Sequence, residues 1–222
     1  MDKFRDILAD ASEKINIQLS EGEKALFNKY YKELIFWNKS VSLVSVKSPL
    51  DIPVKHFIDS LTVLNFIQKK ASRLLDLGSG AGFPGVPLKI VLKPLRLTLV
   101  ESSRKKASFL KNLTRKLDLY SVTIVNERIE SIMGKNDHRG SYDIVISRAT
   151  FKLPELIEIG EPFLSPGGTL IAMKGKKTDI EVRESSGLAL KKGLALPECH
   201  DIELPITGHK RKILLFKKLP RI

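Results

Sequence analysis

The first seventy residues place apolar and polar positions with the period of an α-helix. In the first segment, apolar residues recur every three or four positions, at Phe4, Ile7, Leu8, Ala11 and Ile15. Ser20 followed by Glu23 is a capping-box signature at the start of a second helix, which runs through Trp37. The same spacing predicts a third helix over residues 49–67. We therefore expect residues 1–70 to form an N-terminal helical extension packed on the core.

The pattern changes after Ser72, where short β-rich runs alternate with helical ones. Five strands are predicted, over residues 73–77, 96–101, 122–126, 142–147 and 169–174. Helical patterns lie between them, for example over residues 103–117 and 154–163. This alternation favours a mostly parallel sheet with helices on both faces.

The end of the chain carries a different signal. Two strand-like runs, near residues 194–204 and 212–217, flank the sequence PITGHKR and predict an antiparallel hairpin. Together with the five strands above, the hairpin gives seven strands. The expected fold of residues 71–222 is one Rossmann-like α/β domain with a doubly wound sheet.

Residues 74–88, LLDLGSGAGFPGVPL, place four glycines directly after the first predicted strand. Glycine in a structured segment costs roughly 0.5–1 kcal/mol relative to alanine, so we expect a ligand to approach this backbone closely. In a doubly wound sheet the ligand lies beyond the carboxyl ends of the strands. Glu101 ends the second predicted strand and can accept hydrogen bonds from both hydroxyls of a ribose. The pattern therefore predicts a nucleoside ligand.

The glycine spacing distinguishes between nucleoside ligands. The frame from Gly78 reads GSGAGF, so Phe83 stands where the dinucleotide fingerprint requires its third glycine. S-Adenosylmethionine carries an ammonium and a carboxylate in place of a pyrophosphate. Asp76 suits the ammonium, and the loop amides around Gly78 and Gly80 suit the carboxylate. S-Adenosylmethionine, with S-adenosylhomocysteine as product, is the cofactor that this segment favours.

Charge and composition add a class of partner. The chain has 38 Lys and Arg against 25 Asp and Glu, a net charge of +13, which favours polyanions such as nucleic acid. No apolar run approaches the roughly 20 residues that cross a bilayer, so we expect no membrane partner. Cys199 is the single cysteine and excludes an intrachain disulfide. A reducing, cytoplasmic location is expected.

Five segments resemble a known family in their order and spacing. They are LDLGSGAGFPGVPLKI, LVESSRKKASFLKNL, NERIE, YDIVISRA and GGTLIAMKG. The chain is similar over about residues 30–217 to the bacterial 16S ribosomal RNA guanine-N7 methyltransferase G family, also called glucose-inhibited division protein B. One departure is Ser42-Leu43-Val44, where that family often has Asn-Leu-Thr. The resemblance implies a class I S-adenosylmethionine-dependent methyltransferase that makes 7-methylguanosine in the 530 loop of 16S rRNA.

The resemblance also implies cofactor contacts for individual residues. Gly78 and the backbone near Phe83 would touch the methionine end of the cofactor. Glu101 would hold the ribose, and Ile129 and Glu130, after the third strand, would frame the adenine.

The target side follows from the same resemblance and from the chemistry of guanine. Arg148, which ends the fourth strand, would lie beside both cofactor and target, and Lys174 falls on the same rim. N7 of guanine presents a lone pair and carries no proton at neutral pH, so transfer needs alignment and no general base. Arg148 and Lys174 are therefore expected to act by positioning. The candidate RNA-binding residues are Arg104, Lys105, Arg128, Lys174, Lys176 and Arg211.

Several alternatives stay open at this level. His56 and Asp59 lie one helical turn apart and either line the target pocket or form a satisfied pair on a helix surface. The competing functions are a non-catalytic RNA-binding protein on the same fold, a methyltransferase of another RNA, and a small-molecule methyltransferase. No His, Cys, Asp or Glu cluster has metal-ligand spacing, so no metal is expected. The expected partner is 16S rRNA or the small ribosomal subunit, bound by a monomer.

Overall fold

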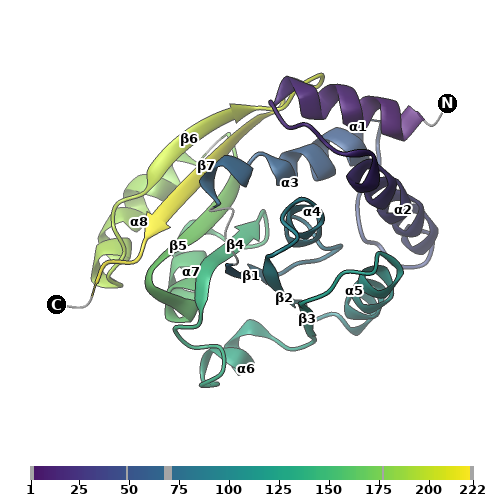
Figure 1. Ribbon diagram of the computed structural model, residues 1–222. Helices are drawn as coiled ribbons and strands as arrows, with labels where there is room; N and C mark the ends of the chain where they lie inside the picture. Colours follow the sequence, from purple (N-terminus) through teal and green to yellow (C-terminus); the bar gives the residue numbers. More distant parts are fainter. Residues whose placement is uncertain (1–2, 49, 68–71, 177, 221–222) are drawn as a thin grey trace.

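A seven-stranded sheet runs through the molecule in the order β3-β2-β1-β4-β5-β7-β6 (Figure 1). The computed structural model describes residues 3–48, 50–67, 72–176 and 178–220. The strands are β1 (Arg73–Leu77), β2 (Arg96–Val100), β3 (Val122–Val125), β4 (Tyr142–Arg148), β5 (Leu164–Gly175), β6 (Glu198–Glu203) and β7 (Lys210–Lys217). β1 to β5 pair in parallel, and β7 pairs antiparallel with both β5 and β6. The predicted doubly wound α/β sheet with an antiparallel C-terminal hairpin is confirmed.

The strand order reverses at β1. Leu75 of this strand is in register with Thr98 of β2 on one side and with Val145 of β4 on the other. Such a reversal is the switch point at which ligands bind in open α/β sheets. β1 has the predicted bounds because its apolar run is buried on both faces, as in a central parallel strand.

Helices cover both faces of the sheet and create two hydrophobic cores (Figure 1). One core contains α4 (Gly85–Val91), α5 (Arg104–Lys116) and the N-terminal extension. The other contains α6 (Ile129–Met133), α7 (Leu153–Gly160), η3 (Glu161–Phe163) and α8 (Asp179–Lys191). None of the helices described here has the length and apolar character needed to cross a bilayer.

The N-terminal extension begins with α1 (Lys3–Lys14) and α2 (Glu21–Asn38). The predicted capping box is present, since Ser20 Oγ accepts from Glu23 N while the Glu23 carboxylate accepts from Ser20 N. Tyr30 of α2 donates its hydroxyl proton to the carbonyl of Ala81 in the loop after β1. The extension therefore shares a core and a hydrogen bond with the sheet domain, and the division of the chain at residue 70 stays a prediction.

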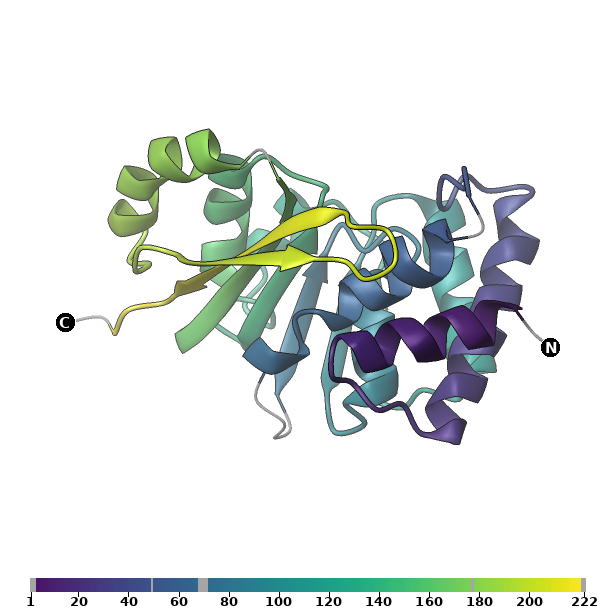
Figure 2. The same ribbon diagram turned by 90° about the horizontal axis from the view of Figure 1, so that it is seen from above.

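The third predicted helix differs in form from the structure. Residues 50–67 contain a π-helical turn, η1 (Pro53–Ile58), then α3 (Asp59–Leu61) and a 3₁₀ turn, η2 (Leu64–Phe66). The hydroxyls of Ser60 and Thr62 donate to carbonyls three or four residues earlier, at 2.6 Å each, and compete with a regular helical ladder. The predicted start at residue 49 lies outside the described residues. Figure 2 shows η1 and α3 beside the turn between β6 and β7.

Candidate functional site

The glycine loop that follows β1 is fixed to the end of β2. Gly80 N donates to the carboxylate of Glu101 at 2.9 Å. Gly78 and Gly80 have positive φ angles of 71° and 57°, which residues with a side chain rarely adopt. A Cβ atom on Gly78 would lie 2.7 Å from Cγ2 of Thr150. The loop therefore needs glycine for its conformation and for its close approach to the chain after β4.

Asp76 is fully buried beneath this loop, at the carboxyl end of β1. Its Oδ2 accepts from Gly85 N at 2.9 Å, and its Oδ1 has no hydrogen-bond partner among the described residues. Burial raises the pKa of Asp76 to about 7, against the opposing effects of the Gly85 N–H group and the charge of Arg148. A buried oxygen without a donor is costly, so the site favours a ligand that brings positive charge nearby.

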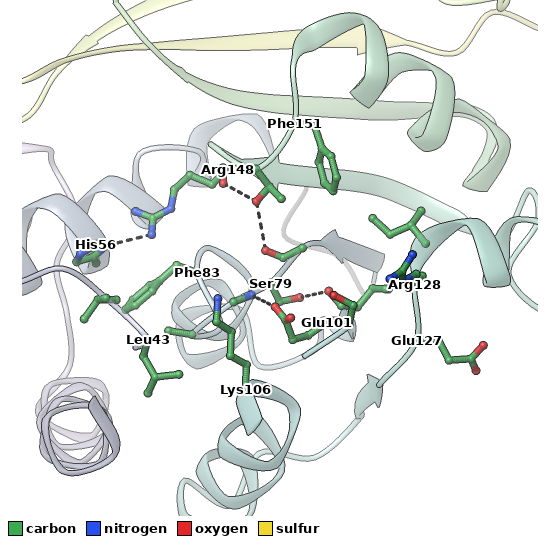
Figure 3. Close-up of a pocket in the computed structure, with 18 of the residues that line it drawn as sticks. Leu43, His56, Ser79, Phe83, Glu101, Lys106, Glu127, Arg128, Arg148 and Phe151 are labelled. Carbon is green, nitrogen blue, oxygen red and sulfur yellow. Dashed lines mark hydrogen bonds between the residues drawn. The ribbon is translucent and has the colours of Figure 1, made fainter. Parts of the chain in front are cut away.

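A cavity of about 680 Å³ lies above the glycine loop at the switch point (Figure 3). Its volume falls within the roughly 300–1,000 Å³ of small-ligand pockets. Loops at the ends of β1 to β4 supply the lining residues that the sequence predicted, namely Gly78, Gly80, Phe83, Glu101, Arg128, Ile129, Glu130 and Arg148. Asp76 lies outside this lining.

Glu101 occupies the middle of the cavity floor, with Phe83 and Arg128 on opposite sides in Figure 3. Its two carboxylate oxygens accept from Gly80 N and Ser103 N at 2.9 and 2.8 Å. A carboxylate offers about four lone-pair positions, so these bonds fix Glu101 and leave acceptor capacity for a ligand's hydroxyl groups.

Eleven lining residues of the first cavity were not among the site residues predicted from the sequence. They are Leu43, Val44, Ser45, Ser79, Ala81, Val100, Ser102, Lys106, Glu127, Thr150 and Phe151. The first three belong to the loop after α2, which Asn38 holds: its Oδ1 accepts from Leu43 N and Val44 N, and its Nδ2 donates to Val44 O, at 2.9, 3.0 and 3.0 Å. The available signal was Asn38 itself, because an asparagine at a helix end commonly organises the following turn.

Arg148, at the end of β4, is held in one geometry from several sides. Its NH1 donates to Lys55 O at 3.0 Å and to Asp59 Oδ2 at 3.1 Å. Its NH2 lies 3.0 Å from Nδ1 of His56, and its guanidinium carbon lies 5.1 Å from the centre of the Phe83 ring. This arrangement connects the N-terminal extension to the carboxyl end of the sheet.

A second cavity of about 510 Å³ adjoins the first, and Ser45, His56 and Arg148 line both. The second cavity is rich in charge: its lining includes five cations, Lys47, Lys55, Arg148, Lys174 and Arg211, and two acids, Asp51 and Asp59. His56 and Asp59 line the second cavity and each contacts Arg148, and Asp59 is buried, so the two residues do not form the alternative pair on a helix surface. The excess of cations suits an anion such as a phosphate group.

Asp59 is the buried centre of the second cavity's charge network. It is 2% exposed, and both of its carboxylate oxygens lie 3.2 Å from Nε of Arg211 while one also accepts from Arg148. One carboxylate therefore holds two arginines, from β4 and β7, in fixed positions.

The other predicted basic residues occupy different places. Lys174 is the second-last residue of β5 and lines the second cavity only, where it donates to Phe151 O at 2.6 Å and to Glu181 Oε2 at 3.0 Å. Arg104, Lys105 and Lys176 are exposed and line neither cavity. They belong to the outer surface and do not reach the site itself.

The site contains few groups for nucleophilic or metal chemistry. Cys199 is exposed on β6 and lines neither cavity. Among the residues that the structure describes, no group of three or more His, Cys, Asp or Glu is placed to hold a metal ion. Burial first, and then the nearby charge of Arg148, lower the pKa of His56 to about 3, so this imidazole is neutral at physiological pH.

The first cavity fits S-adenosylmethionine. The unpartnered Oδ1 of buried Asp76 calls for a cation near the glycine loop, which the ammonium of the amino-acid group would provide. The loop backbone around Gly78 is accessible because it lacks side chains, and Glu101 presents acceptors for a ribose. Ile129 and Phe151 give apolar walls suited to a base.

Comparison with known proteins identifies the family. The family model described as GidB, rRNA small subunit methyltransferase G, matches residues 23–206. A Ribosomal RNA small subunit methyltransferase G from Syntrophus aciditrophicus is 42% identical over 213 residues, covering 96% of this chain and 88% of that protein. One from Desulforamulus reducens is 37% identical over 213 residues, covering 96% of this chain and 89% of that protein.

A solved structure supports the fold independently. The crystal structure of M. jannaschii TYW2 in complex with AdoMet aligns with a TM-score of 0.58 and 17% identity, covering 74% of this chain and 76% of that chain. The resemblance found in the sequence motifs is confirmed by the curated relatives and the family model. The chain belongs to the GidB family of rRNA small subunit methyltransferase G proteins.

Proposed function

We propose that this protein transfers the methyl group of S-adenosylmethionine to N7 of a guanine in 16S rRNA, in the 530 loop of the small ribosomal subunit. The observation that carries the proposal is the junction of two cavities at Ser45, His56 and Arg148. One cavity fits a nucleoside cofactor, and the other has the cationic lining that an RNA nucleotide requires. A methyl donor in the first and a guanosine in the second would meet at this shared wall. Family membership supports small-subunit rRNA as the substrate.

The cofactor would lie across the ends of β1, β2 and β3. Asp76 acts from beneath the loop as the negative charge opposite the ammonium, and Glu101 accepts from the ribose hydroxyls. The residues proposed to bind or frame the cofactor are Asp76, Gly78, Gly80, Phe83, Glu101, Ile129, Glu130 and Arg148.

For this reaction the protein must align N7, the methyl carbon and the sulfur, and must exclude water from the site. Bound S-adenosylmethionine supplies an electrophilic methyl group on a sulfonium. The N7 lone pair forms the new carbon–nitrogen bond, the carbon–sulfur bond breaks with its electron pair left on sulfur, and no proton moves. Arg148 keeps the shared wall in place through its bonds to Asp59 and His56. Lys174 fixes the carbonyl of Phe151 and has a third N–H for a substrate phosphate.

The basic surface would hold the surrounding RNA. Arg104, Lys105, Arg128 and Lys176 are exposed, and their positive charges suit phosphate contacts, which position RNA without reading its sequence. Lys174 and Arg211 add charge at the second cavity. One chain supplies the lining of both cavities, so we propose that the protein works as a monomer, in the cytoplasm where ribosomal subunits are assembled.

Methyl transfer to small ribosomal subunits from cells that lack this activity tests the proposal. With labelled S-adenosylmethionine and nucleoside mass analysis, we expect 7-methylguanosine at one position of 16S rRNA, and none in large subunits. Arg148→Ala should lower kcat/KM at least 100-fold, and Arg183→Ala, a change of an exposed arginine on α8, should leave it within twofold. Cofactor binding without transfer to any RNA would favour a non-catalytic RNA-binding protein, and transfer to another RNA or to a metabolite would replace the proposed target.

A further inference from the structure

His56 stands at the wall between the two cavities, and its ring is fixed on two sides. It is stacked on Phe83, with ring centres 5.2 Å apart and an angle of 27° between the planes. Its Nδ1 lies 3.0 Å from NH2 of Arg148. A guanidinium group has donors and no acceptor, so Nδ1 must accept this hydrogen bond. The imidazole proton of neutral His56 is therefore on Nε2.

The Nε2–H group is available to a ligand. Among the described residues it has no hydrogen-bond partner, and it is not one of the buried unpartnered atoms, so it faces space that a ligand or water can enter. His56 lines both cavities, which places this donor near the point where a methyl donor and its acceptor would meet. Burial and the positive charges of Arg148, Arg211 and Lys55 keep the ring neutral, with Asp51 as the opposing charge.

The edge of guanine that carries N7 also carries O6. Both atoms are acceptors in guanine, whereas adenine has a donor, its N6 amino group, beside N7. The common arginine readout of guanine uses O6 and N7 together and would occupy the lone pair that must attack the methyl group. Arg148 already uses three of its five N–H groups to bond Lys55, Asp59 and His56, so its guanidinium is held by the protein and has two donors left. A single donor that takes O6 and leaves N7 free satisfies both requirements.

The neutral state of this donor matters for the chemistry. As N7 forms its bond to carbon, positive charge develops on the five-membered ring of guanine. A cationic donor at O6 would repel that charge, whereas a neutral N–H group stabilises O6 without this penalty.

We propose that His56 is the residue that selects guanine: its Nε2–H donates to O6 of the target base while N7 stays free to attack. This inference rests on the proposed function and adds to it the basis of its choice of base. Arg148 acts here as a positioning residue, which fixes the tautomer and orientation of His56.

The test compares two target bases with four forms of the enzyme. Small subunits are reconstituted with guanosine or with 2-aminopurine riboside at the target position; the analogue keeps N7 and the 2-amino group and lacks O6. The enzymes are the natural protein, His56→Phe, His56→Gln and a matched control, His209→Phe. The phenylalanine at position 56 keeps a ring against Phe83 and removes the donor, glutamine restores an N–H donor, and His209 is an exposed residue outside both cavities.

We expect the natural enzyme and His209→Phe to prefer guanosine by about 10- to 100-fold in kcat/KM, the discrimination typical of a base contact. His56→Phe should show a kcat/KM on guanosine that is lower by about the same 10- to 100-fold and an unchanged kcat/KM on the analogue, so that it prefers neither base. His56→Gln should recover part of the preference for guanosine. A His56→Phe enzyme that still prefers guanosine as strongly as the natural protein would overturn the inference. Calorimetry should find S-adenosylmethionine affinity within threefold in all four.

A second measurement separates this inference from the proposed function. Nitrogen-15 NMR of the natural protein should show His56 with a protonated Nε2 and an unprotonated Nδ1 from pH 5 to 8. A proton on Nδ1, or titration of His56 near pH 6.5, would overturn the role of His56 even if guanosine is methylated. If the natural enzyme binds the cofactor and methylates no guanosine, the proposed function fails and the role of His56 fails with it.

Discussion

The two cavities meet at His56 and Arg148 and are built in different ways. The first is formed mainly by loops that directly follow strands, and the backbone N–H group of Gly80 ties its glycine loop to Glu101. The second is formed by side chains brought together from distant segments, since Asp59 pairs with Arg148 and Arg211, which lie 89 and 152 residues away in the sequence. The first cavity therefore depends on local backbone geometry, and the second on the docking of the N-terminal extension. Changes in the second should cost fold stability, and changes in the first should mainly cost cofactor affinity.

The largest expected effect comes from Asp59→Ala. This change leaves two partly buried arginines without their shared carboxylate, and removal of one partner of a buried ion pair costs about 3–5 kcal/mol. Urea unfolding should show a loss of that size. Asp179→Ala, which removes a carboxylate that is 70% exposed and pairs with Lys212, is the matched control and should change stability by less than about 1 kcal/mol. Equal losses in the two variants would contradict the special dependence of the second cavity on Asp59.

Asp76, which is buried beneath the first cavity, is an exception to this contrast, because its burial connects the proposed cofactor site to fold stability. Burial raises its pKa to about 7 in the folded protein, against 3.8 for an unperturbed aspartate, so the folded state holds the proton more tightly. The stability from this group is fully present below pH 4 and is lost as the pH rises through 7. Relative to Asp76→Asn, the unfolding free energy of the natural protein without cofactor should fall by about 3 kcal/mol between pH 4 and 8.

Urea unfolding at several pH values measures this difference directly. Asparagine at position 76 keeps an oxygen for Gly85 N and has no charge to bury, so this variant is the reference for the natural protein. Parallel stability curves for the two proteins would show that folding does not shift the pKa of Asp76, against the expectation.

Gly78→Ala should act on cofactor binding. The added Cβ would lie 2.7 Å from Cγ2 of Thr150, and Gly78 has a φ of +71°. The loop must therefore shift where we propose that the methionine end of the cofactor binds. We expect S-adenosylmethionine affinity to fall about 100-fold, which corresponds to about 2.7 kcal/mol. Gly187→Ala in α8, where nothing lies within 4 Å of the added atom, should leave affinity unchanged. Calorimetry measures the affinity for S-adenosylmethionine in both variants. An unchanged affinity in Gly78→Ala would show that the cofactor binds elsewhere.

The smallest expected effect comes from Lys176→Ala on the outer surface. Lys176 is exposed and lines neither cavity, so its removal should leave fold stability and cofactor affinity unchanged. If it contacts a phosphate, affinity for small subunits should fall several-fold and the salt dependence of binding should become shallower by about one counterion. An unchanged salt dependence would remove Lys176 from the proposed RNA surface.

The same contrast explains what could be predicted from the sequence. β1 and the lining residues in the loops after β1 to β4 could be predicted in large part, because strand, glycine loop and strand-end carboxylate follow one another at short range. Glu101 and Ile129 could be placed at the correct strand ends without knowledge of distant contacts. The second cavity was not readable in this way, because no local pattern signals that Asp59 will meet Arg211.

Two helical segments show the limits of periodicity. Residues 50–67 have helical spacing, but the hydroxyls of Ser60 and Thr62 bond backward and the segment forms a π-helical turn that presents His56 and Asp59 to Arg148. The helix α8 was not predicted, since its apolar residues do not form a single stripe and Ile180 and Leu190 are exposed. In neither segment did the spacing of apolar residues alone determine the structure.

The hydroxyl of Tyr30 connects the N-terminal extension to the glycine loop. It donates to Ala81 O inside the glycine loop, and a Cβ on Gly82 would lie 2.9 Å from the same hydroxyl. A bound cofactor that orders the loop would therefore also favour the docking of α2, and the docking of α2 would favour cofactor binding to the same extent. Through this one hydrogen bond, the position of α2 and the conformation of the glycine loop are coupled.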